Sequence, residues 1–99
     1  MLSDPFFSLA VRRSDAGTVV TVAGELDVAT APELAQALAD ADGQVTVDLS
    51  ATTFADPSAL RVLLAARADG VRIRVLGRRG GQVARLLALT DTEELLSLV

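Results

Sequence analysis

The chain has 99 residues, a formal net charge of −4 and a hydrophobic content of 51%, which fits one folded domain with its own core. It contains no cysteine and no histidine, which excludes disulfides, Ser-His or Cys-His catalysis and the usual zinc ligand sets. The negative charge and the scarcity of aromatic residues argue against nucleic acid as a partner. No apolar run is long enough for a membrane span, and no secretory signal pattern is present, so we expect a cytoplasmic protein.

Two strands joined by a tight turn are predicted at the start of the chain. Apolar and polar residues alternate over residues 7–11 and again over residues 18–23, which is the period of a strand with one buried face. Residues 14–17, Ser-Asp-Ala-Gly, are typical of a turn. The two strands should therefore form an antiparallel hairpin.

A helix is predicted to follow this hairpin. Thr30 and Glu33 have the spacing of a capping box, in which each side chain bonds a free backbone N–H group of the first turn. Gly43 is a suitable stop. The residues expected on the buried stripe of this helix are Leu34, Leu38 and Ala41.

The next strand and helix, within residues 45–64, form the stretch around which we expect the chain to be organised. Residues 45–50 alternate as a half-buried strand, and Leu60, Leu63 and Leu64 recur at helical spacing. Asp56 is a favourable N-cap, and Pro57 suits the first helical position. Ser58 should then project from the first turn, near free backbone N–H groups and the positive end of the helix dipole. This arrangement fits a phosphorylation switch; the alternative is a helix that is merely well capped.

The last third of the chain predicts one further strand and two helices. Residues 71–75 alternate as a strand, but two of them, Arg72 and Arg74, point to a face that cannot be core. The sheet should therefore carry helices on one side only near this strand. Apolar residues around 83–87 mark a third helix, and residues 90–98 predict a short fourth helix because Thr90 and Glu93 again have capping-box spacing.

The predicted element order is therefore β-β-α-β-α-β-α-α. Strands separated by single helices favour parallel pairing, whereas the opening hairpin is antiparallel. We predict a small single α/β domain over residues 1–99, with a mixed four-stranded sheet and helices mainly on one face.

Three carboxylates follow or end predicted strands and are candidate site residues. Asp27, Asp48 and Asp56 would meet at one edge of a parallel sheet, where ligands commonly bind. They would form an acidic rim around Ser58, unless they only cap turns or face solvent. No basic or nucleophilic partner accompanies them and no EF-hand spacing is present, so we expect no catalytic residue, metal or cofactor.

The loop over residues 77–81 carries two arginines and three glycines before a helix. Such a loop can bind an anion, but it matches neither the Walker A spacing nor the dinucleotide fingerprint. A solvated turn is the simpler interpretation.

Five segments together resemble the STAS domain family, and within it the bacterial anti-sigma factor antagonists. They are residues 24–27 (Gly-Glu-Leu-Asp), 30–34 (Thr-Ala-Pro-Glu-Leu), 47–50 (Val-Asp-Leu-Ser), 54–60 (Phe-Ala-Asp-Pro-Ser-Ala-Leu) and 83–87 (Val-Ala-Arg-Leu-Leu). The resemblance runs from about Phe7 to the C-terminus. It implies a mixed sheet with helices mainly on one side, as predicted above.

The resemblance also implies a function and a phosphorylation site. In that family a partner that is both anti-sigma factor and serine kinase phosphorylates a hydroxyl at the position of Ser58. The unphosphorylated antagonist binds this partner and frees the sigma factor, whereas the phosphorylated form lets go, and a phosphatase is a further partner that this scheme allows. The partner-binding residues expected around Ser58 are Asp27, Asp56, Pro57, Ala59 and Arg61.

Two positions depart from the family pattern, which usually reads Asp-Ser-Ser-Gly-Leu or Asp-Ser-Thr-Gly-Leu. Pro57 replaces the first hydroxyl and Ala59 replaces the glycine. If a kinase cannot accommodate them, the chain would be a constitutive antagonist. Two different roles also fit the sequence: a STAS regulatory subunit docked on an ABC lipid-transport ATPase or a stress-sensing assembly, and a small-ligand or nucleotide-binding module.

Overall fold

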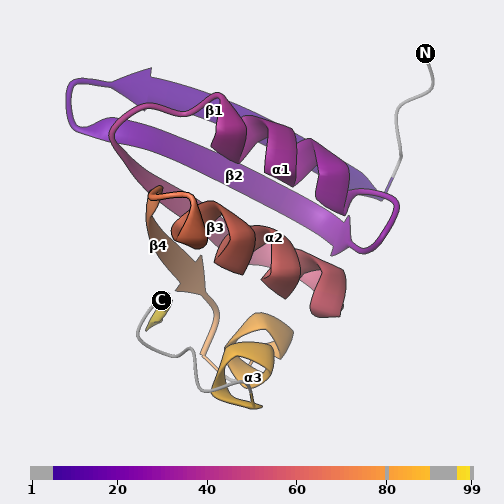
Figure 1. Ribbon diagram of the computed structural model, residues 1–99. Coiled ribbons are helices and arrows are strands. Elements are labelled where there is room, and N and C mark those ends of the chain that lie inside the picture. Colours follow the sequence, from indigo (N-terminus) through magenta and orange to yellow (C-terminus); the bar gives the residue numbers. More distant parts are fainter. Residues whose placement is uncertain (1–5, 80, 90–95, 99) are drawn as a thin grey trace.

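The computed structural model describes residues 6–79, 81–89 and 96–98. Its central feature is a five-stranded mixed sheet (Figure 1). The strands lie in sequence order across the sheet, so that β1 and β5 are its two edges. β1 pairs antiparallel with β2, and every other neighbouring pair is parallel. In chain order the elements are β1 (Phe7–Ser14), β2 (Gly17–Leu26), α1 (Ala31–Ala39), β3 (Gln44–Ala55), α2 (Pro57–Ala68), β4 (Arg72–Gly77), α3 (Gln82–Leu89) and β5 (Leu96–Leu98).

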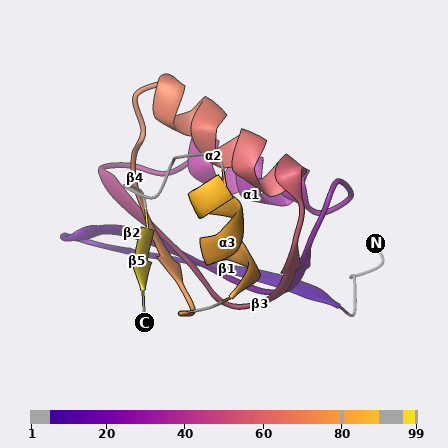
Figure 2. The same ribbon diagram turned by 90° about the horizontal axis from the view of Figure 1, so that it is seen from below.

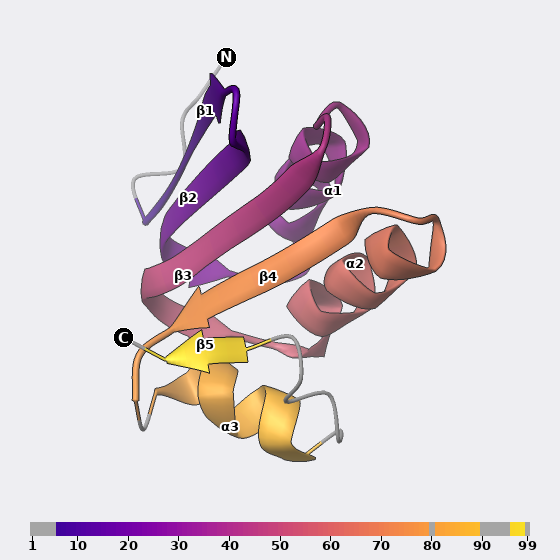
Figure 3. The same ribbon diagram turned by 90° about the vertical axis from the view of Figure 1, so that its left-hand side faces the viewer.

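The three helices cover one face of the sheet and leave the other open (Figures 2 and 3). Strand alternation explains this, because every second side chain over residues 18–22 of β2 and 45–49 of β3 is buried beneath the helices. Arg72 and Arg74 of β4 lie on the open face and are exposed. The largest fully buried side chains are Leu26, Leu34, Leu38, Leu49, Leu63, Leu87, Val20, Val22, Val45, Val47 and Val75.

The predicted fold class is confirmed, and so is the opening hairpin, which turns between Ser14 and Gly17. β3 is longer than the predicted strand over residues 45–50, because it continues to Ala55. The extra length is absorbed by two register shifts against β2, after which Leu26 pairs with Ala55. As a result β2 and β3 end side by side.

The capping box predicted for α1 is wrong. Thr30 precedes the helix, but its side chain makes no cap hydrogen bond. The hydroxyl instead donates to the carbonyl oxygen of Glu25 at 3.0 Å and accepts from the backbone N–H of Asp27 at 2.9 Å. These two bonds satisfy backbone groups of the preceding loop, and this competing local interaction replaces the capping box.

The fourth helix is also wrong where the structure describes it. Residues 90–95 of that prediction lie outside the described residues, whereas Leu96–Leu98 form β5, with Leu96 paired to Val75. Pairing with β5 satisfies backbone groups along the outer edge of β4, which would otherwise be open. The sheet thus has a fifth strand at the position of the expected helix.

Among the described residues no helix combines the length and apolarity needed to cross a membrane.

Candidate functional site

The start of α2 is built as the sequence predicts. Asp56 is the N-cap in an extended conformation, and its Oδ1 accepts a hydrogen bond from the backbone N–H of Ser58 at 2.8 Å. Pro57 occupies the first helical position, where its missing N–H leaves no bond unmade. The carboxylate of Asp56 also lies at the positive end of the helix dipole. The helix therefore begins at a defined residue with Ser58 in its first turn.

The Ser58 side chain is half-buried. Within the described part of the chain, no residue is hydrogen-bonded to its hydroxyl, whereas the backbone N–H of Ser58 donates to Asp56. The hydroxyl is thus held at the helix start by the backbone and not by a bond of its own. That leaves both its proton and its lone pairs available to a partner.

The loop between β2 and α1 lies next to this helix start. Asp27 Oδ1 accepts hydrogen bonds from the backbone N–H groups of Ala29 at 2.9 Å and Thr30 at 3.2 Å. The backbone N–H of Asp56 in turn donates to the carbonyl oxygen of Leu26 at 3.2 Å. The two acidic turns, at Asp27 and Asp56, are therefore neighbours at the end of the sheet where the carboxyl ends of β2 and β3 lie. This end of the sheet is called the edge below.

Asp48 does not belong to this edge, so the predicted rim of three carboxylates is wrong in that member. Its Oδ1 accepts from the backbone N–H of Ser50 at 2.9 Å and from the Ser50 hydroxyl at 2.6 Å. Both bonds lie where the register between β2 and β3 first shifts, between Thr21 and Ala23. Asp48 therefore stabilises a bulge within β3. No group of three or more carboxylates among the described residues could hold a metal ion.

The side chains that follow Ser58 divide between surface and core. Arg61 and Pro57 are exposed, whereas Ala59 is only 2% exposed and joins Leu60 and Leu63 in the core. The methyl group of Ala59 thus occupies the interior, and the residue as a whole offers almost no surface to a partner. A helix places residues 59, 60 and 63 on one face, which explains the division.

Gln82 is a supporting residue that the sequence did not indicate. Its Oε1 accepts a hydrogen bond from the backbone N–H of Ala55 at 2.9 Å. This bond joins the first residue of α3 to the last residue of β3, directly before Asp56. The two residues are 27 positions apart, and no local pattern predicts such a contact.

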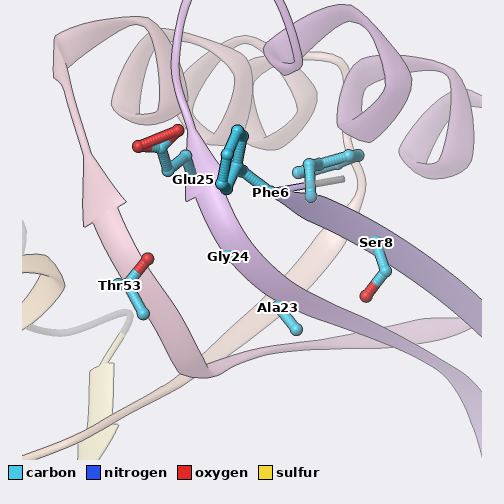
Figure 4. A pocket seen from close by; sticks show the side chains of 7 residues that line it. Phe6, Ser8, Ala23, Gly24, Glu25 and Thr53 are labelled. Atoms are coloured by element: carbon cyan, nitrogen blue, oxygen red, sulfur yellow. The ribbon is translucent and has the colours of Figure 1, made fainter. Parts of the chain in front are cut away.

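Two hollows flank the edge. One, of about 310 Å³, lies over the ends of β1 to β3. The residues that line it include Phe6, Glu25 and Thr53 (Figure 4). The other, of about 380 Å³, is lined partly by Arg78 and Arg79 of the predicted anion loop. Residue 80 of that loop lies outside the described residues, and both arginines are exposed.

Removing the N-cap should destabilise the domain measurably. We expect Asp56→Ala to lower the free energy of unfolding by about 0.5–2 kcal/mol, because the backbone N–H of Ser58 loses its acceptor. Asp56→Asn is the matched control, since it keeps an acceptor oxygen and should lose less. Urea denaturation of the three proteins measures the difference. Equal stability of Asp56→Ala and the wild type would contradict this role for Asp56.

Fold and site together define a small α/β domain with a well-capped helix start where β2 and β3 end. The family described as "Mlab, STAS domain" matches residues 9–98. The chain therefore belongs to the STAS domain family. The comparison with curated proteins gives no match.

Solved structures similar to this chain are anti-sigma factor antagonists. One, from Mycobacterium paratuberculosis, is 31% identical with a TM-score of 0.78, over 98% of this chain and 89% of its own. The antagonist SpoIIAA in its unphosphorylated form is 14% identical with a TM-score of 0.73, over 93% and 88%. SpoIIAA from Bacillus in its phosphorylated form is 14% identical with a TM-score of 0.70, over 93% of this chain and 91% of its own. The last two likenesses concern the fold.

Proposed function

We propose that this chain is a cytoplasmic anti-sigma factor antagonist that binds an anti-sigma factor with serine kinase activity and is released when Ser58 is phosphorylated. The observation that carries the proposal is the Ser58 hydroxyl in the first turn of α2, positioned by Asp56 and without a hydrogen bond from any described residue. The likeness to an antagonist of 31% identity supports the class of partner.

The chain needs no catalytic residue for this role. The partner kinase would transfer the terminal phosphoryl group of ATP to Oγ of Ser58, forming the new O–P bond as the bond to ADP breaks and the hydroxyl proton passes to a base of the kinase. The chain supplies only the acceptor and the docking surface. The docking residues in the proposal are Asp27, Asp56, Pro57 and Arg61, and Ala59 supports this surface from the core beneath it.

Within the free domain, phosphorylation should change little. The phosphate brings a charge of about −1.5 to −2, which the N-terminus of α2 stabilises by roughly 0.3–1 kcal/mol at an exposed site. The nearby carboxylates of Asp27 and Asp56 oppose it by a comparable amount at surface dielectric. The opposing effects nearly cancel, so the fold should persist.

At an interface the same phosphate has a larger effect. Burying a charge without a partner costs several kcal/mol, and each 1.4 kcal/mol is a factor of ten in affinity. Phosphorylation would therefore release the partner by making the docking surface unfavourable, without refolding the antagonist.

Affinity capture from the host with ATP present tests the proposed class. The tagged wild-type chain should retain an anti-sigma factor with a kinase domain, identified by mass spectrometry. Recovery of an ABC transporter ATPase or a stress-sensing assembly in its place would favour the other STAS role. Stabilisation by a nucleotide in a thermal-shift measurement, with no protein partner, would favour a ligand-binding module.

A further inference from the structure

Exposed apolar side chains gather at the edge where β2 and β3 end. Among the described residues five large hydrophobic side chains are exposed, and three of them lie at this edge. We name these three the rim patch: Phe6 is 66% exposed, Val28 73% and Phe54 41%. The other two, Val11 and Val19, lie further along β1 and β2.

The backbone brings the rim patch together. Phe54 pairs with Glu25 across the β2–β3 ladder, and the backbone N–H of Glu25 donates to the carbonyl oxygen of Phe6 at 2.7 Å. Val28 follows two residues after Leu26, which pairs with Ala55. Val28 and Phe54 are therefore within two residues of the paired ends of β2 and β3, and Phe6 is hydrogen-bonded to Glu25 beside them.

The loop that carries Val28 is held in place. The bonds that Asp27 Oδ1 accepts from the backbone N–H groups of Ala29 and Thr30 span Val28. Thr30 is 3% exposed, and its hydroxyl is hydrogen-bonded to backbone groups of the same loop. An apolar side chain that is held in water by a rigid loop loses little conformational freedom when a partner covers it. Val28 is thus suited to be an anchor for a partner.

Carboxylates border the rim patch. Glu25 is exposed beside Phe54, and Asp27 and Asp56 are half-buried beside Val28 and Ser58. Their carboxylates are complementary to arginine or lysine side chains. We propose that the rim patch is the apolar centre of the docking surface, and that it fits an anti-sigma factor bearing an apolar depression bordered by basic side chains.

This inference rests on the proposed function and adds the chemistry of its partner. An apolar centre excludes water, so a phosphate formed on Ser58, which follows Asp56 at the same end of the sheet, would have to lose its hydration when the partner docks. The rim patch therefore explains why one hydroxyl at its border controls release.

Substitutions with a matched control test the rim patch. Purified anti-sigma factor kinases of the source organism are titrated against the wild-type chain, Val28→Ser, Phe54→Ser and Val19→Ser. Val19 is the control because it is 38% exposed on the same strand as Glu25 but lies away from the edge. We expect Val28→Ser and Phe54→Ser each to weaken binding about tenfold, and Val19→Ser to bind like the wild type.

The remaining outcomes separate the two proposals. If Ser58→Asp weakens binding while Val28→Ser and Phe54→Ser bind normally, the rim patch is not part of the docking surface and the proposed function stands. If Val19→Ser weakens binding as much as Val28→Ser, the interface is not centred on this edge. If the wild-type chain binds none of these kinases, the proposed function and the rim patch both fail. Thermal midpoints of all variants within a few degrees of the wild type show that each one is folded.

Discussion

Ser58→Asp is expected to weaken binding to the anti-sigma factor about hundredfold, which corresponds to about 2.8 kcal/mol at 1.4 kcal/mol per factor of ten. The aspartate places a charge at the start of α2, where docking would bury it without a partner. The thermal midpoint should stay close to that of the wild type, because a helix N-terminus tolerates a negative charge. Isothermal titration and a thermal melt measure the two effects on the same preparation.

Two controls give this result its meaning. Ser58→Ala should bind like the wild type, because it removes the phosphate acceptor without adding charge. Ser14→Asp adds the same charge at the hairpin turn, where Ser14 pairs with Gly17, and should also bind normally. Retained tight binding by Ser58→Asp would count against the switch, and a large drop in its thermal midpoint would show that Ser58 has a structural role.

Gly24→Ala should give the largest loss of stability among the substitutions considered. Gly24 has φ of +92°, and a Cβ at this position would overlap the carbonyl oxygen of Phe6. The left-handed backbone costs about 1–2 kcal/mol for alanine, and displacing β1 costs about 1–3 kcal/mol more. We therefore expect unfolding free energy to fall by about 2–5 kcal/mol in urea denaturation.

Gly70→Ala separates the two parts of that cost. Gly70 has φ of +95°, but a Cβ there would meet no atom within 4 Å. The free energy of unfolding of Gly70→Ala should therefore fall only by the cost of the left-handed backbone, about 1–2 kcal/mol. Equal losses at the two glycines would show that β1 does not pack closely against Gly24.

Local patterns were sufficient for the elements that satisfy their own backbone groups. The start of α2 was predictable because Asp56 and Pro57 cap and begin the helix within two residues of Ser58. Strand alternation likewise predicted which face of β3 and β4 is buried, and the exposed arginines of β4 indicated an open face.

The errors arise where another interaction outcompetes a local motif. Thr30 has capping-box spacing, yet its hydroxyl bonds the β2–α1 loop. Leu96–Leu98 were expected to be helical, yet they pair with β4. The side chain of Ala59 lies in the core, and its part in partner binding stays a prediction.

The site itself could be predicted only in part. Asp27 and Asp56 meet because β2 and β3 are parallel and end together, as the element order implied. The register shifts that move Asp48 away from them depend on pairing across two strands, which a single sequence does not reveal. The same is true of the bond from the Ala55 backbone N–H to Gln82.

The intact mass of the chain after incubation with its anti-sigma factor kinase and ATP tests the central claim most directly. The wild type should gain one phosphate and Ser58→Ala none, and the modified wild type should no longer bind the kinase. An unmodified wild type, or equal modification of Ser58→Ala, would contradict the assignment of Ser58 as the switch.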